Sequence, residues 1–275
     1  MNKSFKYIGG LVVFLIIELF LISQLPYQKI LVSFLDVGQG DSIFIRTPDD
    51  YTVLIDGGPS ASVLDELGEV VPIYNRTIDL IVLSHPHADH VNGLVEVVKR
   101  FEVKKVLIIG TPYHNAFYKE FLRVINQNEI SLNIAQSNSD IKLGNYVFID
   151  VVWPTNSMVG KHFENVNNAS LSVRVLFDDY SVLLTGDAEI EQEREIVDSG
   201  FDIWADILKA GHHGSRTASS DEFLDKVEPE TVVIQTEKEN DFNHPHKETL
   251  QKFRERNIEV KRNDVEGRID FILSR

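Results

Sequence analysis

The sequence contains no cysteine in its 275 residues, and it is short of positive charge. Without thiols the chain can form no disulfide framework, thiolate zinc finger or iron–sulfur cluster, so any bound metal must be held by histidines and carboxylates. The 27 basic and 42 acidic residues give a formal net charge of −15. Because nucleic-acid phosphates must be met by positive charge, this balance argues against a basic track over the whole surface. A nucleic-acid ligand would therefore need a local patch of positive charge on an otherwise acidic surface.

A long apolar run is present at the amino terminus. The run Tyr7–Leu25 contains one charged residue, Glu18, follows Lys3 and Lys6, and ends before Pro26. Its length is sufficient to span a bilayer as a helix. The preceding lysines predict an amino terminus in the cytoplasm and the remaining chain outside it. A cleaved secretory signal and a buried core helix are the alternatives to this uncleaved, single-pass anchor.

Strand-like and helix-like segments alternate after the apolar run. Short β-rich runs between residues 30 and 55 are separated by turn signals, which favours a β-meander. The apolar strand Asp79–Ser84 then precedes a segment of helical spacing, Val91–Phe101, and the second half repeats this style without a linker. We therefore predict an α/β protein with an anchor over residues 1–28 and one folded domain over residues 29–275.

The strongest chemical signal follows the strand that ends at Ser84. His85, His87, Asp89 and His90 lie within six residues, directly before a helix. A tight loop after a strand directs side chains from a rigid support, and imidazole with carboxylate suits zinc, manganese or iron. A helix cap alone would require one polar residue rather than three histidines. The alternation predicts that His85 and His87 share one metal and that Asp89 and His90 turn to a second.

Polar residues also follow later apolar strands. Asp187 ends one strand, His212 and His213 follow another, and His244 and His246 lie in a third short motif. Seven of the nine histidines therefore fall in clusters. Histidines that served only as surface or core residues would be scattered. The clustering predicts a metal centre assembled from several strand ends.

Together these motifs resemble the metallo-β-lactamase superfamily, and within it the ComEC-like branch, the hydrolase domain of competence proteins. The strings that carry the resemblance are FLDVGQGDS at 34–42, LIDGG at 54–58, LSHPHADHVNGL at 83–94, LLTGD at 183–187, HHGS at 212–215 and NHPH at 243–246. The resemblance implies an αββα sandwich with a dinuclear metal site at one edge, between the two sheets.

The resemblance also implies six ligands for two divalent ions, zinc or manganese. The first ion would take His85 and His87, the second Asp89, His90 and His212, with Asp187 as the bridge. His213 is the less favoured member of its pair. The third histidine that the wider superfamily supplies to the first ion has no counterpart in Asn165–Ser170. The first ion is therefore expected to bind more weakly, or to be completed by His213, water or substrate.

Other residues near the motifs are candidates for supporting roles. Asp56 matches an acid that orients a ligating histidine, and Asp41 is a candidate for the same role or for a turn. With Asp89, His244 and His246 are the catalytic candidates, the two histidines by binding phosphate or protonating a leaving group. Further candidates for the outer layer of the site or for phosphate binding are Lys209, His213, Ser215 and Arg216.

The functional hypothesis from the resemblance is a membrane-anchored, extracytoplasmic metal-dependent hydrolase, a phosphodiesterase or nuclease acting on DNA. Two divalent ions about 3.5–4 Å apart can activate water and stabilise both oxygens of a phosphodiester displacement. The alternative is a phosphorylcholine-esterase-like hydrolase of cell-wall or lipid phosphodiesters, because such domains share the LDVGQGDS and HPHADH motifs. A β-lactamase or lactonase is less favoured, since HHGS and NHPH are not its pattern. A catalytically inactive binding module is the hypothesis from a different class.

Overall fold

The computed structural model describes residues 12–15, 17, 29–72, 75–137 and 139–275. The predicted anchor, Tyr7–Leu25, lies mainly outside these residues, although residues 12–15 and 17 are helical. In the described part of the chain, no helix combines the length and the apolar character needed to cross a bilayer. The anchor therefore stays a prediction.

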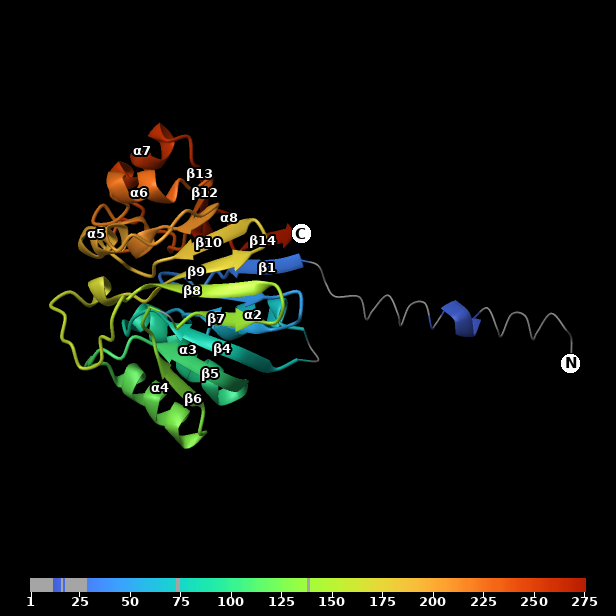
Figure 1. Ribbon diagram of the computed structural model, residues 1–275. Coiled ribbons are helices and arrows are strands. Elements are labelled where there is room, and N and C mark those ends of the chain that lie inside the picture. Colours follow the sequence, from blue (N-terminus) through green and yellow to red (C-terminus); the bar gives the residue numbers. More distant parts are fainter. Residues whose placement is uncertain (1–11, 16, 18–28, 73–74, 138) are drawn as a thin grey trace, which may run out of the picture.

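Two seven-stranded sheets form the body of the protein (Figure 1). The first sheet has the order β14 (Ile269–Ser274), β1 (Lys29–Phe34), β2 (Ile43–Arg46), β3 (Thr52–Ile55), β4 (Thr77–Leu83), β5 (Glu102–Ile108) and β6 (Ser131–Ile134). The second has the order β13 (Glu259–Arg262), β12 (Thr231–Ile234), β11 (Ile207–Lys209), β10 (Tyr180–Leu184), β9 (Ser172–Phe177), β8 (Val147–Trp153) and β7 (Ile141–Leu143). Strands β3 to β6 and β10 to β13 run parallel, so each sheet has an antiparallel part and a parallel part.

Helices lie on the outer faces of both sheets. The first sheet is covered by α2 (Val63–Val70), α3 (Ala88–Arg100) and α4 (Ala116–Gln127). The second is covered by α5 (Ile190–Asp198), α6 (Asp221–Val227) and α7 (Lys247–Glu255). Short elements complete the described chain: α8 (Asn263–Glu266) and the 3-10 turns η1 (Val166–Ala169) and η2 (Gly211–Gly214).

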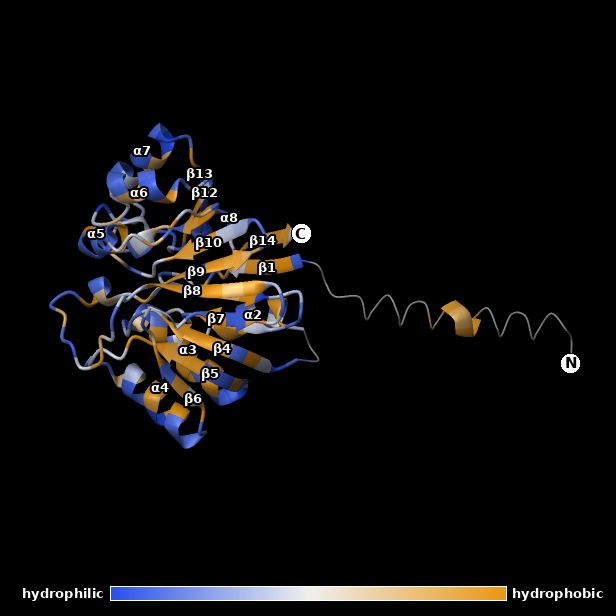
Figure 2. Cartoon of the chain, in the orientation of Figure 1, coloured by the Kyte–Doolittle hydropathy of each residue, from blue (hydrophilic) through white to orange (hydrophobic). Residues whose placement is uncertain are grey.

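The protein has four layers, which are helices, first sheet, second sheet and helices. One apolar cluster fills each of the three spaces between these layers. Along β2, Ile43 and Ile45 face the other sheet, whereas Phe44 between them packs under the helices. In β4, Leu80 and Val82 face the other sheet, and Ile81 faces the helices. Successive residues of a strand point to opposite faces, so a strand buried on both faces is apolar throughout. Figure 2 shows apolar strands inside and hydrophilic residues on the helices, which confirms the predicted αββα sandwich.

The sheet topology brings the polar loops to one edge. The loops after β4, β10 and β11 each leave the carboxyl end of a parallel strand. Gly186, in the loop after β10, has a φ of +55°, and a Cβ atom there would lie 2.8 Å from Cβ of Ser84. Glycine permits both this left-handed backbone and this close approach. The loops that carry His85 and Asp187 are thereby placed side by side.

Candidate metal centre

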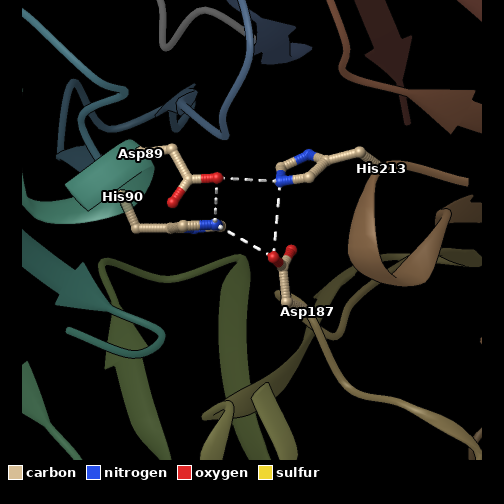
Figure 3. Close-up of side chains that lie close together, drawn as sticks. All are labelled: Asp89, His90, Asp187 and His213. Atoms are coloured by element: carbon tan, nitrogen blue, oxygen red, sulfur yellow. Dashed lines mark hydrogen bonds and ion pairs between the residues drawn. The ribbon is translucent and has the colours of Figure 1, made fainter. Parts of the chain in front are cut away.

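Four side chains converge at this edge: Asp89 and His90 at the start of α3, Asp187 after β10 and His213 after β11 (Figure 3). Their ligand atoms all lie within 4.8 Å of one another. Nε2 of His213 is 3.2 Å from Oδ2 of Asp89 and 3.3 Å from Oδ2 of Asp187. Nε2 of His90 is 3.4 Å from the same oxygen of Asp187. Two imidazoles and two carboxylates therefore point at a common space.

His90 is oriented by a buried acid. Its Nδ1 lies 2.8 Å from Oδ2 of Asp56, and Asp56 also accepts hydrogen bonds from the backbone N and the Oγ of Ser84 at 2.8 and 2.6 Å. With its Nδ1 proton donated to Asp56, His90 presents Nε2 to Asp89 and Asp187. That Nε2 is buried and has no hydrogen-bond partner in the described chain. A nitrogen so placed between two carboxylates fits a metal ligand.

His213 has corresponding support on the other side. Its Nδ1 lies 2.9 Å from the backbone oxygen of Gln235 and 3.2 Å from Oδ1 of Asp41. Asp41 is in turn ion-paired with Lys209, which donates to the backbone oxygen of Gly186 at 2.9 Å. All these side chains are buried. Asp41 therefore lies at ion-pair distance from the ring of His213, whose hydrogen bond goes to Gln235, and Lys209 is a buried cation without access to a substrate phosphate.

The charged groups around this space favour a bound cation. Burial raises the pKa of Asp187, but the positive charges of His213, His90 and Lys209 outweigh it and hold that pKa well below its usual range. Burial lowers the pKa of His90, but Asp187, Asp89 and Asp56 outweigh it and raise that pKa well above its usual range. A proton or a metal ion at Nε2 would satisfy the same carboxylates. The donor set of nitrogen and oxygen atoms suits a divalent metal.

The two adjacent histidines of the HHGS motif occupy different places. Both His212 and His213 have left-handed backbones, with φ of 46° and 54°. The turn directs His213 into the four-residue cluster and leaves His212 partly exposed, 3.0 Å from Oε1 of Glu189. Nδ2 of Asn167 in η1 is 3.4 Å from the His212 ring. The geometry therefore reverses the expected order of the pair, because His213 lies with Asp89 and His90.

His85 and His87 form a second, smaller group next to the cluster. Nε2 of His85 lies 3.0 Å from Nδ1 of His87 and 3.9 Å from Oδ2 of Asp187. Burial lowers the pKa of His85 well below its usual range, with the charge of His90 as the next cause, so His85 is neutral and can act as a ligand. In the described chain, neither ring belongs to a close group of three or more His, Asp or Glu ligand atoms. The pair is the position predicted for the weaker ion.

The NHPH motif lies beside the centre rather than in it. The ring of His244 is 6.2 Å from that of His213 and 5.3 Å from that of His212. Burial, followed by the charges of His213, His212 and His246, lowers the pKa of His244 to about 4, so this ring is neutral at pH 7. Nδ1 of His246 accepts the backbone N–H of Arg216 at 3.2 Å.

The remaining candidates, Ser215 and Arg216, lie at the end of the HHGS motif and directly after it. Ser215 is buried, and its hydroxyl lies 3.0 Å from Oγ1 of Thr217 within the turn. Arg216 is exposed and lines a cavity of about 460 Å³ together with His244 and His246. Of the residues predicted for phosphate binding, Arg216 is therefore the cation that faces solvent.

Several residues of the site were not predicted. Gln235 contacts His213 through its backbone oxygen, and its side chain donates to the backbone oxygens of Leu35 and Ser42, both at 3.0 Å. Its position directly after β12 is a strand end, the same signal that identified Asp187. Glu189, the partner of His212, is the N-cap residue of α5 and belongs to none of the sequence motifs.

Comparison with known proteins decides the family. The metallo-beta-lactamase superfamily model matches residues 35–153 and 156–236. The chain belongs to this superfamily. It is 30% identical to ComE operon protein 3 of Bacillus subtilis, over 87% of this chain and 32% of that protein. It is 29% identical to competence protein ComA of Neisseria gonorrhoeae, over 91% of this chain and 33% of that protein. The predicted ComEC-like branch is confirmed, and the chain spans about a third of the length of these relatives.

A solved structure shows the same fold. The metallo-beta-lactamase fold protein YhfI from Bacillus subtilis superimposes with a TM-score of 0.59 at 17% identity, over 90% of this chain and all of that one. At this identity the likeness concerns the fold alone. The family match and the His/Asp cluster support the assignment of a metal-dependent hydrolase of the superfamily.

Proposed function

We propose that the chain is a phosphodiesterase that cleaves DNA at the metal centre. The observation that carries the proposal is the convergence of Asp89, His90, Asp187 and His213. Nε2 of His90, which has no hydrogen-bond partner among the described residues, is directed between two carboxylates. The competence-protein relatives favour DNA as the substrate. A divalent ion held there would polarise a phosphoryl oxygen and lower the pKa of a water molecule.

The protein's own residues would hold the divalent ions and fix the orientation of the ligand side chains. Oδ2 of Asp187 lies 3.4 Å from Nε2 of His90 and 3.9 Å from Nε2 of His85, so the Asp187 carboxylate would help to hold ions on both sides. Oδ1 of the same carboxylate is 3.4 Å from Nζ of Lys209, which restrains its rotation. Asp56 and the backbone oxygen of Gln235 fix the ring orientation of the two histidine ligands. Such outer partners preorganise the site.

A phosphorylcholine-esterase-like activity on cell-wall or lipid phosphodiesters is the second candidate. The observation that favours it is charge. The cavity beside His244 is lined by four acidic residues (Glu237, Glu239, Glu248 and Asp264) against three basic ones (Arg216, Lys247 and Arg262), and the whole chain carries −15. An extended polyanion gains little electrostatic binding energy from such a surface, whereas a small substrate with a cationic headgroup is not repelled by it.

A substrate panel on the full-length chain tests the proposal. Metal-stripped protein is reconstituted separately with zinc and with manganese, then given single-stranded DNA, double-stranded DNA and a phosphorylcholine ester. We expect DNA cleavage that EDTA and Asp89→Ala abolish. Asp178→Ala is the matched control, because Asp178 lies before β10, at the opposite end of that strand from Asp187. Release of choline phosphate without DNA cleavage would replace the proposal by the second candidate.

We also propose that residues 29–275 lie outside the cytoplasm, attached by the apolar run Tyr7–Leu25. The support is the length of that run and the lysines before it. Protease added to intact cells should digest the domain. A domain that is digested only after lysis would contradict this location.

A further inference from the structure

We propose that Phe242 is a stacking platform for an unpaired nucleobase, and that Arg216 contacts a phosphate of the same strand. The inference rests on the proposed phosphodiesterase function and narrows its substrate to single-stranded nucleic acid. Neither residue belongs to the cluster of candidate metal ligands.

Phe242 is an exposed aromatic residue held in a fixed position. It is 60% exposed, in the loop between β12 and α7. Asn240 organises this loop, because its Oδ1 accepts the backbone N–H groups of Phe242 and His244 at 3.2 and 2.9 Å. Its Nδ2 also donates to the backbone oxygen of His244 at 2.7 Å. The ring is therefore presented to solvent by an ordered turn.

The ring lies next to the metal centre. Phe242 stacks on His244 with ring centroids 5.7 Å apart and planes 25° from parallel. His244 is followed at 6.2 Å by His213, which belongs to the four-residue cluster. One imidazole thus separates Phe242 from the candidate metal ligands. A planar group on the open surface of Phe242 would belong to a nucleotide close to the phosphate at the centre.

Arg216 supplies a charge for the backbone of such a strand. It lines both the 460 Å³ cavity and a second cavity of about 620 Å³, which is also lined by Asn165 and Asn168. Its backbone N–H is held by His246, while its guanidinium has no ion pair with a described residue. Lys247 lines the first cavity and likewise has no such pair in the described chain. Phosphate contacts of this kind position a strand without reading its sequence.

Stacking should contribute more than charge at this surface. Two phosphate contacts to a single strand predict a slope of about −1.4 for log affinity against log salt concentration, which is shallow for a nucleic-acid-binding protein. The four acidic residues of the cavity offset the attraction of its three basic residues for further phosphates. A base–aromatic stack, by contrast, is insensitive to sequence and available to any unpaired base. In a duplex the base faces are covered by their neighbours, so the platform favours a single strand.

A choline group would use a different arrangement. Quaternary ammonium ligands are held in cages of several aromatic rings by cation–π attraction. In the described chain, the ring contact of Phe242 is with His244 alone. One open aromatic surface fits a flat base better than a trimethylammonium group.

Equilibrium binding to the full-length chain tests the inference. The probes are a fluorescent oligothymidylate and the same deoxyribose-phosphate backbone without bases, followed by anisotropy. We expect Phe242→Ala to weaken oligothymidylate binding about 5- to 150-fold, the range for loss of one stack. Phe242→Trp should retain binding, and the base-free backbone should not distinguish Phe242→Ala from the unsubstituted protein. Phe201→Ala is the matched control, since Phe201 is 44% exposed and precedes β11, at the opposite end of that strand from His213.

The outcomes separate the inference from the proposed function. Affinities for oligothymidylate within twofold for Phe242→Ala and the unsubstituted protein would overturn the platform, even if DNA is cleaved. Loss of phosphorylcholine binding in Phe242→Ala, with oligothymidylate binding unchanged, would overturn the nucleobase assignment. Absence of DNA cleavage, with binding that depends on Phe242, would contradict the phosphodiesterase and leave the platform supported.

Discussion

The His90 side and the His85 side of the metal centre share Asp187 but differ in what supports them. On the His90 side, Asp89, His90, Asp187 and His213 form a close group, and each histidine has a buried partner for its second nitrogen. On the His85 side, Nε2 of His85 lies 3.0 Å from Nδ1 of His87 and 3.9 Å from Oδ2 of Asp187. Ligand number and outer support both favour the first side, so one ion should bind more tightly than the other.

The largest effect is expected from Asp187→Ala, which removes the carboxylate common to both sides. Metal affinity at the tighter position should fall more than the roughly 10- to 100-fold that is typical of outer-partner changes, and the second ion should not bind. Metal analysis after reconstitution and dialysis measures this. Retention of two ions would mean that Asp187 is not the bridge.

His213→Ala and His212→Ala form a matched pair of neighbouring histidines. We expect about a 100-fold loss of affinity at the tighter position for His213→Ala, and less than about threefold for His212→Ala, since His212 faces Glu189. Isothermal titration with zinc distinguishes them. The opposite ranking would restore His212 as the ligand.

Asp56→Asn tests the outer partner of His90. The amide keeps the size of the side chain but replaces one acceptor oxygen by a donor, so His90 loses a partner for its Nδ1 proton. Affinity at the tighter position should fall about 10-fold, at the low end of the outer-partner range. Glu96→Gln serves as the control, because Glu96 is a half-buried acid of the same helix that pairs with Lys99 and Arg100 instead of a candidate ligand. An unchanged affinity in Asp56→Asn would show that ring orientation does not depend on this acid.

The smallest effect at the tighter position is expected from His87→Ala. His87 lies on the His85 side, so the affinity for the first ion should change less than about threefold, while the second ion is lost. Stoichiometry by metal analysis gives the result. Loss of both ions together would show that the two sides bind as one unit.

Strong periodic patterns predicted most of the architecture. Strand β4 and helix α3 follow from a continuous apolar run and from Val91, Leu94, Val95 and Val98 at helical spacing, all of which are buried. Strand β13 was missed, because Glu259–Arg262 is a polar strand at a sheet edge and has no apolar alternation. Helix α2 was also missed, although its buried residues Val63, Leu67 and Val70 stand at helical spacing. The segment Ile203–Ala210 predicts a longer strand than β11, which begins only at Ile207.

The site was less predictable where it depends on backbone conformation. His85, His87, Asp89, His90 and Asp187 stand in motifs at strand ends, and the structure brings them to one edge. The choice between His212 and His213 depends on two left-handed residues in one turn, which the residue types do not specify. The partner of His213 is a backbone oxygen, and every residue carries one, so the residue type could not single out Gln235 among the strand ends.

Titration of the metal-stripped, full-length chain with zinc tests the asymmetry of the centre most directly. The account predicts two binding steps, the first at least about 10-fold tighter than the second, with the first step removed by His213→Ala and the second by His87→Ala. Two equivalent ions bound in a single step, or a first step that survives in His213→Ala, would contradict it.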